Sequence, residues 1–273
     1  MTMGEVPAEI LLVGCGKMGS ALLTGWLQTD QVGHVKIVEP YPPDAALPLS
    51  DRVMLHDTVA TIDPHWRPTV VVFAVKPQAI TDVVPAYREI VAAGAMVLSI
   101  AAGRTMAGFE ALLGAAAIVR AMPNTPAAIG RGITVAVGND RATHGEKAVA
   151  HRLLEAVGSV SWVEDEGLLD AVTAVSGSGP AYVFLLIEAM TAAGIAAGLP
   201  PELAERLARE TVSGSGELAR QSPESAAQLR RNVTSPHGTT EAALRVLMAA
   251  EGMERLMVRA VDAATRRSRE LAG

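Results

Sequence analysis

Cysteine and aromatic residues are scarce in this sequence of 273 residues, and each shortage narrows what the protein can be. A single cysteine, Cys15, excludes a disulfide within the chain and is typical of a reducing compartment, so we expect a cytoplasmic protein. Aromatic residues make up only 3% of the sequence, so Ala, Val, Leu and Gly must fill most of the core. Such side chains suit closely packed helices and a buried parallel sheet better than a β-sandwich.

Positive charge is also in short supply. Lys and Arg number 23 against 29 Asp and Glu, which gives a formal net charge of −6 at pH 7. Nucleic-acid binding needs a surplus of Lys and Arg on one face, so we expect no nucleic-acid partner. The six histidines are scattered and have no Cys or carboxylate companions at zinc-binding spacing, so we expect no metal site.

The marks of a targeting or membrane segment are missing as well. Residues 1–9 carry acidic side chains and no basic region ahead of the first apolar stretch, so the pattern does not predict a signal peptide. The apolar segment 171–199 is long enough to cross a membrane. Its first third is broken by Gly177-Ser178-Gly179-Pro180, however, and Glu188 interrupts the rest. We therefore expect a helix buried against protein here, and no membrane partner.

Short β-branched runs alternate with helical stretches from Glu9 to about Val163, a pattern typical of an α/β fold with a doubly wound parallel sheet. Beyond Glu164 the sequence predicts helices only. This change predicts two domains, an α/β domain over residues 1–165 and an all-helical domain over residues 166–273. The predicted strands cover residues 10–13, 35–38, 53–55, 69–75, 95–100, 118–121, 133–137 and 160–163, and the later helices cover residues 180–197, 201–220, 225–232, 239–250 and 253–271.

The helical domain is rich in small residues and poor in aromatic bulk. By itself it would bury only a thin core. A second copy of the chain would supply the missing surface most simply, so we predict at least a homodimer, formed mainly by residues 166–273.

A glycine-rich sequence, Gly14-Cys15-Gly16-Lys17-Met18-Gly19, connects the strand predicted at residues 10–13 to a helix predicted at residues 20–27. Gly14 permits a tight turn, Gly16 lets the backbone approach a pyrophosphate, and Gly19 lets the helix pack on the strand. N–H groups at the start of the helix attract the negative charge. The alternative is a strand-to-helix turn that needs glycine only for its shape. We predict that Gly14, Gly16, Lys17, Met18 and Gly19 bind a nicotinamide dinucleotide.

Glu39 ends the second predicted strand. An acidic side chain at this point can accept hydrogen bonds from a ribose hydroxyl and would repel a 2′-phosphate. We therefore favour NADH over NADPH, while Lys36 and Arg52, which could serve a phosphate, leave NADPH open. Ligands of doubly wound folds bind where the strands end, so the small residues that follow two later strands are further candidates. The candidates are Ala74, Val75, Lys76 and Pro77 after one strand and Ala101, Ala102 and Gly103 after the next.

Four segments narrow the function further. They are Ala74-Val75-Lys76-Pro77-Gln78, Arg120-Ala121-Met122-Pro123-Asn124-Thr125-Pro126-Ala127, Ser176-Gly177-Ser178-Gly179-Pro180-Ala181-Tyr182 and Leu229-Arg230-Arg231-Asn232-Val233-Thr234-Ser235-Pro236-His237-Gly238-Thr239-Thr240. In order and spacing they resemble the signatures of the pyrroline-5-carboxylate reductase family, over residues 10–247. The last segment is specific to that family, whereas the first two are partly shared with related β-hydroxyacid-type dehydrogenases.

The resemblance implies a Rossmann-like domain, a helical domain that forms a homodimer and binds substrate, and often a ring of five dimers. It implies reduction of 1-pyrroline-5-carboxylate to L-proline by NADH or NADPH, the last step of proline biosynthesis. The imino acid would lie at the loop 233–240 against the nicotinamide, at a site shared by two chains. Asn124 would contact the cofactor, and the hydroxyl of Thr240 would lie by the imine nitrogen. Carried over position by position, the loop residues are Thr240 and Ser235 as catalytic residues and Asn232, Val233, Thr234, Gly238 and Thr239 as substrate-binding residues.

The residues of this loop also predict a helix N-terminus without reference to any family. Thr239, Thr240 and Glu241 precede the apolar helical stretch 242–247. Exposed N–H groups at such an end can bind a substrate carboxylate without an arginine. The alternative is that these hydroxyls are ordinary caps and turn residues.

His237 departs from the family, which usually has glycine at this position. A glycine there can serve a backbone angle that costs other residues, although His tolerates the left-handed region better than bulkier residues do. The substitution puts the loop shape, and with it the selection of substrate size, in doubt. The imidazole either contacts the substrate or tunes protonation at the site, or it points to solvent.

Two other functions stay open. One is another imine or 2-oxoacid reductase of the same architecture, in which His237 marks a changed substrate. A hydroxyacid enzyme of the related type would need a lysine or a similar proton donor between residues 170 and 199, and the sequence has none there. The other is a nucleotide-binding regulatory protein without turnover, against which the intact Ser235 and Thr240 argue.

Overall fold

The computed structural model describes residues 7–41 and 47–272, and the prediction for residues 1–9 therefore lies largely outside it. The chain forms two compact units. One comprises Met1–Gly177 and Thr265–Gly273, as far as their residues are described, and the other comprises Ser178–Ala264. The sequence predicted a domain boundary between residues 165 and 166, whereas the compact units separate after Gly177 and residues 265–273 belong to the first unit. The roles assigned to the two domains, cofactor binding and dimerisation with substrate binding, stay predictions.

The first unit is built on one eight-stranded sheet, and the fold class predicted from the sequence is confirmed. The strand order is β3-β2-β1-β4-β5-β6-β7-β8. All neighbours are parallel except β6 and β7, so the sheet is mostly parallel, and its one antiparallel pair was not foreseen from the sequence. The strands are β1 (Ala8–Val13), β2 (Val32–Val38), β3 (Val53–His56), β4 (Val70–Phe73), β5 (Met96–Ser99), β6 (Ile118–Met122), β7 (Gly132–Gly138) and β8 (Gly158–Trp162).

The antiparallel pair follows from the short connection between β6 and β7. A parallel neighbour needs a crossover of a dozen or more residues, usually a helix, to carry the chain back to the starting edge. Residues 123–131 contain only the 3-10 helix Thr125–Ile129. The chain therefore turns at the carboxyl edge of β6 and returns beside it.

Helices cover both faces of the sheet and produce two separate cores. The strands alternate between these cores, so Val70 and Val72 of β4 face one, while Val71 and Phe73 face the other. The indole N–H of Trp26 donates to the Leu153 carbonyl oxygen at 2.8 Å and joins the two helices of the first core. The first core is covered by α1 (Lys17–Leu27) and α5 (His144–Glu155), and the second by α2 (Ile80–Val83), α3 (Arg88–Ala92) and α4 (Met106–Leu113).

The last part of the first unit is held to the rest of that unit by partly buried polar contacts. The Arg120 guanidinium of β6 lies 2.5 Å from the Glu166 carboxylate, which also accepts a hydrogen bond from the Met106 N–H at 2.7 Å. Asp170 of α6 (Leu168–Val172) accepts a hydrogen bond from the Ser268 hydroxyl at 2.7 Å. A π-helical turn, Thr173–Gly177, follows α6. These contacts explain why residues after the last strand belong to the first unit.

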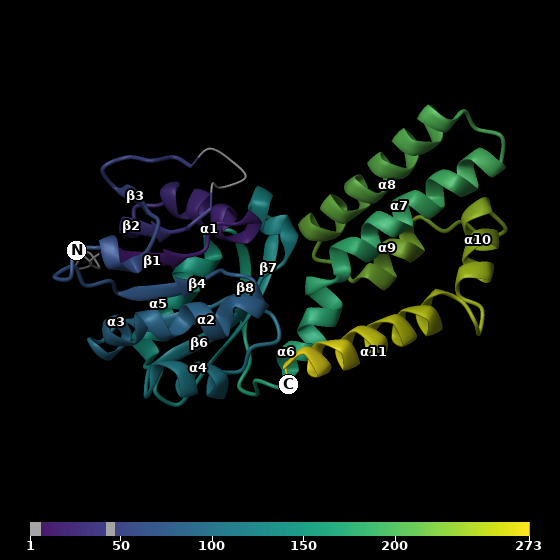
Figure 1. Cartoon of the computed structure of the whole chain (residues 1–273). Helices are drawn as coiled ribbons and strands as arrows, with labels where there is room; N and C mark the ends of the chain where they lie inside the picture. Colours follow the sequence, from purple (N-terminus) through teal and green to yellow (C-terminus); the bar gives the residue numbers. More distant parts are fainter. Residues whose placement is uncertain (1–6, 42–46, 273) are drawn as a thin grey trace. The chain divides into compact units, whose positions relative to one another are not determined.

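The second unit is all-helical, as predicted. Its helices are α7 (Gly179–Ala196), α8 (Pro201–Gln221), α9 (Ala226–Asn232), α10 (Thr239–Leu247) and most of α11 (Met253–Ala272), and α7 packs along α8 (Figure 1). The apolar segment predicted to be buried is helical, but no residue of α7 is buried within the described part of the chain. By length and composition alone, one described segment, Leu168–Ala196, could cross a membrane, a test that apolar helices of soluble proteins also pass. The expected burial is therefore not provided by the chain itself.

Candidate active site

The glycine-rich loop leaves β1 at the carboxyl edge of the sheet, and its first glycine is fixed by geometry. Gly14 has a φ of 86°, in the left-handed region that favours glycine. A β-carbon at this position would lie 2.8 Å from Cγ1 of Val75 and 3.0 Å from the backbone of Ala74. The loop after β1 and the residues after β4 are therefore in direct contact.

The start of α1 is open and carries no cap. Gly16 is the N-cap residue, no side chain caps the first turn, and no acidic residue lies in that turn. A β-carbon at Gly16 would meet no atom within 4 Å. Lys17 is exposed and Met18 is half-buried beside this opening. Free N–H groups, the positive end of the helix dipole and open space together form an anion site that suits a pyrophosphate.

Glu39 lies on the other side of the glycine-rich loop and binds its backbone. Its carboxylate accepts hydrogen bonds from the Cys15 N–H at 2.9 Å and from the Tyr41 N–H at 3.3 Å. The side chain is half-buried at the end of β2. It therefore lies against the glycine-rich loop, at the point where an adenosine ribose would enter.

Cys15 is a buried thiol with a structural role. Burial, assisted by the charge of Glu39, raises the pKa of the Cys15 thiol from 9.0 to about 11. At pH 8 the thiolate fraction is therefore about 100-fold lower than in an unperturbed thiol.

We expect folded protein to react with iodoacetamide at Cys15 at least about 100-fold more slowly than free cysteine does, as followed by mass spectrometry. Protein unfolded in urea is the control, and labelling of the folded protein at the rate of free cysteine would contradict this account.

The other predicted cofactor residues follow β4, β5 and β6 at the same edge of the sheet. Ala74 and Val75 are half-buried, and Lys76 is exposed at the N-cap of the 3-10 helix Pro77–Ala79. After β5, Ala101 and Gly103 are buried and Ala102 is half-buried. The structure therefore brings together, along one edge, all the residues that the sequence predicted to bind the cofactor.

Asn124, which follows β6, has a side chain that is already engaged. Its Oδ1 accepts the Ile133 N–H at 2.9 Å, and its Nδ2 donates to the Ser176 carbonyl oxygen at 3.2 Å. The amide thus fixes the start of β7 and the π-helical turn. A cofactor contact by Asn124 stays a prediction.

The predicted substrate residues lie together in the second unit, around the start of α10. The helix begins at Thr239, after the N-cap Gly238, and no side chain caps its first N–H groups. Thr240 is half-buried, while Ser235 and Thr239 are exposed. The predicted helix N-terminus is therefore confirmed, and it can receive an anion.

Two other residues of this loop are held within the unit. The Asn232 side chain donates to Glu224 at 2.9 Å and accepts from Gln228 at 2.7 Å. Thr234 donates its hydroxyl to the Arg230 carbonyl oxygen at 2.6 Å. These bonds shape the loop, and substrate binding by Asn232, Val233 and Thr234 stays a prediction.

Glu241 was named from the sequence at the start of this helix, but its contact with the loop was missed. The Glu241 carboxylate accepts a hydrogen bond from the N–H of His237, which has a φ of 60°. The signal was present, since a carboxylate at the third position of a helix can reach back to the N–H groups that precede it.

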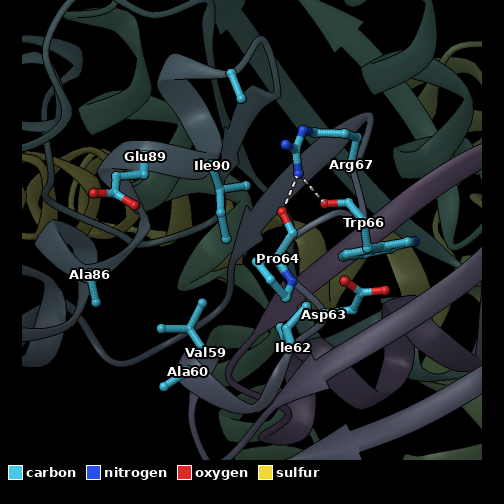
Figure 2. Close-up of a pocket in the computed structure, with 11 residues that line it drawn as sticks. Val59, Ala60, Ile62, Asp63, Pro64, Trp66, Arg67, Ala86, Glu89 and Ile90 are labelled. Carbon is cyan, nitrogen blue, oxygen red and sulfur yellow. Dashed lines mark hydrogen bonds between the residues drawn. The ribbon is translucent and has the colours of Figure 1, made fainter.

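A separate cavity of about 380 Å³ lies in the first unit, away from the predicted site residues. It is lined by the loop after β3 and by residues of α3 and the turn before it, as Figure 2 shows. Arg67 on its rim donates to the carbonyl oxygens of Pro64 and Trp66 at 2.5 and 3.2 Å. Its cation is thus used for loop structure. Within residues 7–41 and 47–272, no group of three His, Cys, Asp or Glu side chains could hold a metal ion.

Comparisons with known proteins agree with both halves of this description. A family model described as pyrroline-5-carboxylate reductase dimerisation matches residues 166–271. A model described as NADP oxidoreductase, coenzyme F420-dependent, matches residues 9–103. The pyrroline-5-carboxylate reductase of Pseudomonas aeruginosa is 40% identical over 266 residues, which cover 97% of both chains. That of Pisum sativum is 35% identical and covers 95% of this chain and 94% of its own.

Solved structures extend the likeness to the fold. A pyrroline-5-carboxylate reductase from Coxiella burnetii is 32% identical, with a TM-score of 0.88 over 98% of this chain and 100% of that one. The Plasmodium falciparum pyrroline carboxylate reductase, solved with NADP bound, is 27% identical, with a TM-score of 0.83 over 99% of this chain and 100% of that one. Because the likeness runs through both the glycine-rich loop and the hydroxyl-rich loop, this chain belongs to the pyrroline-5-carboxylate reductase family.

Proposed function

We propose that this chain reduces 1-pyrroline-5-carboxylate to L-proline with a reduced nicotinamide cofactor, as the last step of proline biosynthesis. The observation that carries the proposal is that both motif segments fold into uncapped helix N-termini, at Gly16 before α1 and at Gly238 before α10. The first suits the pyrophosphate of the cofactor, and the second suits the carboxylate of the imino acid.

The reaction needs a hydride at the imine carbon and a proton on the nitrogen. When bound, the reduced nicotinamide supplies the hydride from its C4. The protein holds donor and acceptor in contact and polarises the C=N bond. We assign the hydrogen bond to the imine nitrogen to the Thr240 hydroxyl, and Ser235 shares the same turn. The nitrogen is protonated when the substrate arrives as its iminium form, so no strong side-chain acid is required.

The proposal includes a preference for NADH. The Glu39 carboxylate lies at the ribose end of the loop and is held there by the Cys15 N–H. A second negative charge, such as a 2′-phosphate, would be repelled at this position. The preference belongs to the proposal alone, since the Plasmodium falciparum relative was solved with NADP.

The Glu39→Gln variant tests this preference. Glutamine retains an acceptor oxygen but loses the charge, so the ratio of kcat/KM for NADH to that for NADPH should fall by roughly tenfold. The ratio is used because any loosening of the loop affects both cofactors alike. Asp51→Asn, at the opposite edge of the sheet, is the matched control and should leave the ratio unchanged. An unaltered ratio in Glu39→Gln would remove Glu39 from cofactor selection.

The proposed assembly is a cytoplasmic homodimer, with a ring of five dimers as the larger form. The dimerisation model that matches residues 166–271 supports a dimer. The exposed apolar helix α7 supports it as well, because an apolar surface of this length calls for a covering partner. Two chains would also allow the loop of one to complete the cofactor site of the other.

The experiment that tests the function compares NADH and NADPH in steady-state turnover of 1-pyrroline-5-carboxylate. A six-membered cyclic imine and several 2-oxoacids run in parallel would identify a related reductase with a different substrate. Nucleotide binding without turnover of any of these compounds would identify a regulatory protein instead.

A further inference from the structure

The turn before α10 has a conformation that its residue types do not favour. The Gly238 N–H donates to the Ser235 carbonyl oxygen at 3.1 Å and closes a β-turn over these four residues. Pro236, at the second position, is restricted to negative φ, while His237, at the third, has a φ of 60°. A positive φ at the third position alone is the mark of a type II turn. This position normally takes glycine, because a β-carbon disfavours the left-handed region.

The competing conformation differs by the orientation of one peptide group. Between type I and type II turns, ψ at the second position changes by about 150° and φ at the third by about 170°, which flips the peptide between them. The type I turn gives the third residue a negative φ that histidine adopts without strain. The residue types therefore favour the type I turn, with the Pro236–His237 peptide flipped from its observed orientation. Another group must hold this peptide in the observed type II turn.

Glu241 is placed to hold this peptide. Its Oε2 accepts a hydrogen bond from the His237 N–H at 2.5 Å, reaching back past the N-cap Gly238. A flip would turn the N–H away and present the Pro236 carbonyl oxygen to the carboxylate, so that two oxygens would repel each other. A charge-assisted hydrogen bond is roughly twice as strong as a neutral one. The bond therefore selects the type II turn.

We propose that Glu241 is a positioning residue for the substrate loop. It holds His237 in the left-handed conformation, and the two residues together replace the glycine that such a turn would otherwise need. The turn sets the direction in which the chain enters α10, and so places the N–H and hydroxyl groups of Thr239 and Thr240. This inference rests on the proposed function, in which those groups receive the imino acid.

A double-mutant cycle in the full-length enzyme tests the pair. In the presence of His237, Glu241→Ala should raise KM for 1-pyrroline-5-carboxylate about threefold to tenfold, while kcat and KM for NADH change less than about twofold. In the His237→Gly background, the same substitution should change KM for the imino acid less than about twofold, since glycine adopts the turn freely. Glu241→Gln retains an acceptor oxygen but loses the charge and gains N–H donors, so its KM for the imino acid should lie between those of the unaltered enzyme and Glu241→Ala.

The control removes an acidic side chain from the first turn of another helix. Glu202→Ala, in α8, alters a helix dipole in the same way and should leave KM for the imino acid unchanged. Equal increases of KM in the two His237 backgrounds would show that Glu241 is only a general helix cap and would overturn the proposal. An unchanged KM in Glu241→Ala with His237 present would overturn it as well.

Hydrogen exchange separates this inference from the proposed function. The His237 amide should exchange about tenfold faster in Glu241→Ala, as followed by mass spectrometry, and at an unaltered rate in Glu202→Ala. If this result holds and the enzyme does not reduce 1-pyrroline-5-carboxylate, the proposed function fails while the role of Glu241 in the turn stands. An unaltered exchange rate in Glu241→Ala would contradict that role.

Discussion

Replacing Thr240 by alanine should lower kcat for 1-pyrroline-5-carboxylate about 100-fold while the Kd of NADH changes less than about twofold. The hydroxyl is assigned to the imine nitrogen, where a hydrogen bond orients and polarises the C=N bond for hydride transfer. Thr240 is assigned to the substrate and not to the cofactor, so its loss should appear in kcat rather than in the binding of NADH. Stopped-flow measurement of turnover and fluorescence titration of NADH would give the two quantities.

Thr240→Ser is the companion variant, since it retains the hydroxyl and removes only a methyl group. It should keep kcat within about fivefold of the unaltered enzyme. Equal turnover in Thr240→Ala would remove Thr240 from the mechanism. A large loss in both variants would indicate that the methyl group, and thus packing at the start of α10, is what matters.

The second large effect is expected at the glycine-rich loop, where alanine at Gly16 should weaken cofactor binding and alanine at Gly14 should destabilise the fold. Gly16→Ala adds a methyl group to open space, so it should lower the free energy of unfolding by no more than about 1 kcal/mol, the cost of alanine at an N-cap. The same methyl group would stand where the pyrophosphate is proposed to bind, so the Kd of NADH should rise at least about tenfold. Isothermal titration and urea unfolding would measure the two effects.

Gly14→Ala should instead destabilise the fold. The left-handed backbone costs alanine about 1 kcal/mol, and a β-carbon 2.8 Å from Cγ1 of Val75 adds steric strain, so we expect a loss of about 2 to 3 kcal/mol. Gly145→Ala is the control in the same unit, because its β-carbon would meet only the Thr143 hydroxyl, at 4.0 Å. The account of the loop would be wrong if Gly16→Ala bound NADH as the unaltered enzyme does.

The pattern of the sheet could be predicted from the sequence because buried strands have a strong local signature. Residues 70–73 are four apolar residues in a row, and in the structure they alternate between two cores. The direction of β7 was missed because direction is a property of the connection and not of the strand. The length of residues 123–131 was the available signal, since no crossover helix fits into it.

The candidate site was predictable where a motif encodes backbone shape, and less so where side chains form specific hydrogen bonds. Gly14 and Gly16 were identified because glycine has few other reasons to occupy such a turn. The contact of Glu39 with the Cys15 N–H, the two bonds of the Asn124 amide and the bond from His237 to Glu241 depend on the three-dimensional course of the backbone. These hydrogen bonds cannot be predicted from the pattern of apolar and polar residues in the sequence.

The reversal of direction at β7 has a consequence for how this fold can diversify. The returning loop, residues 123–131, stands at the same edge as the glycine-rich turn, and its Ala128 lines a small hollow with Lys17 and Ser20 of α1. Beyond Asn124, whose amide holds the start of β7, such a connection can change its composition without disturbing the strands that it joins. Evolution can therefore change the surface beside the proposed nucleotide site through substitutions in this loop alone, while the eight strands and their two cores stay as they are.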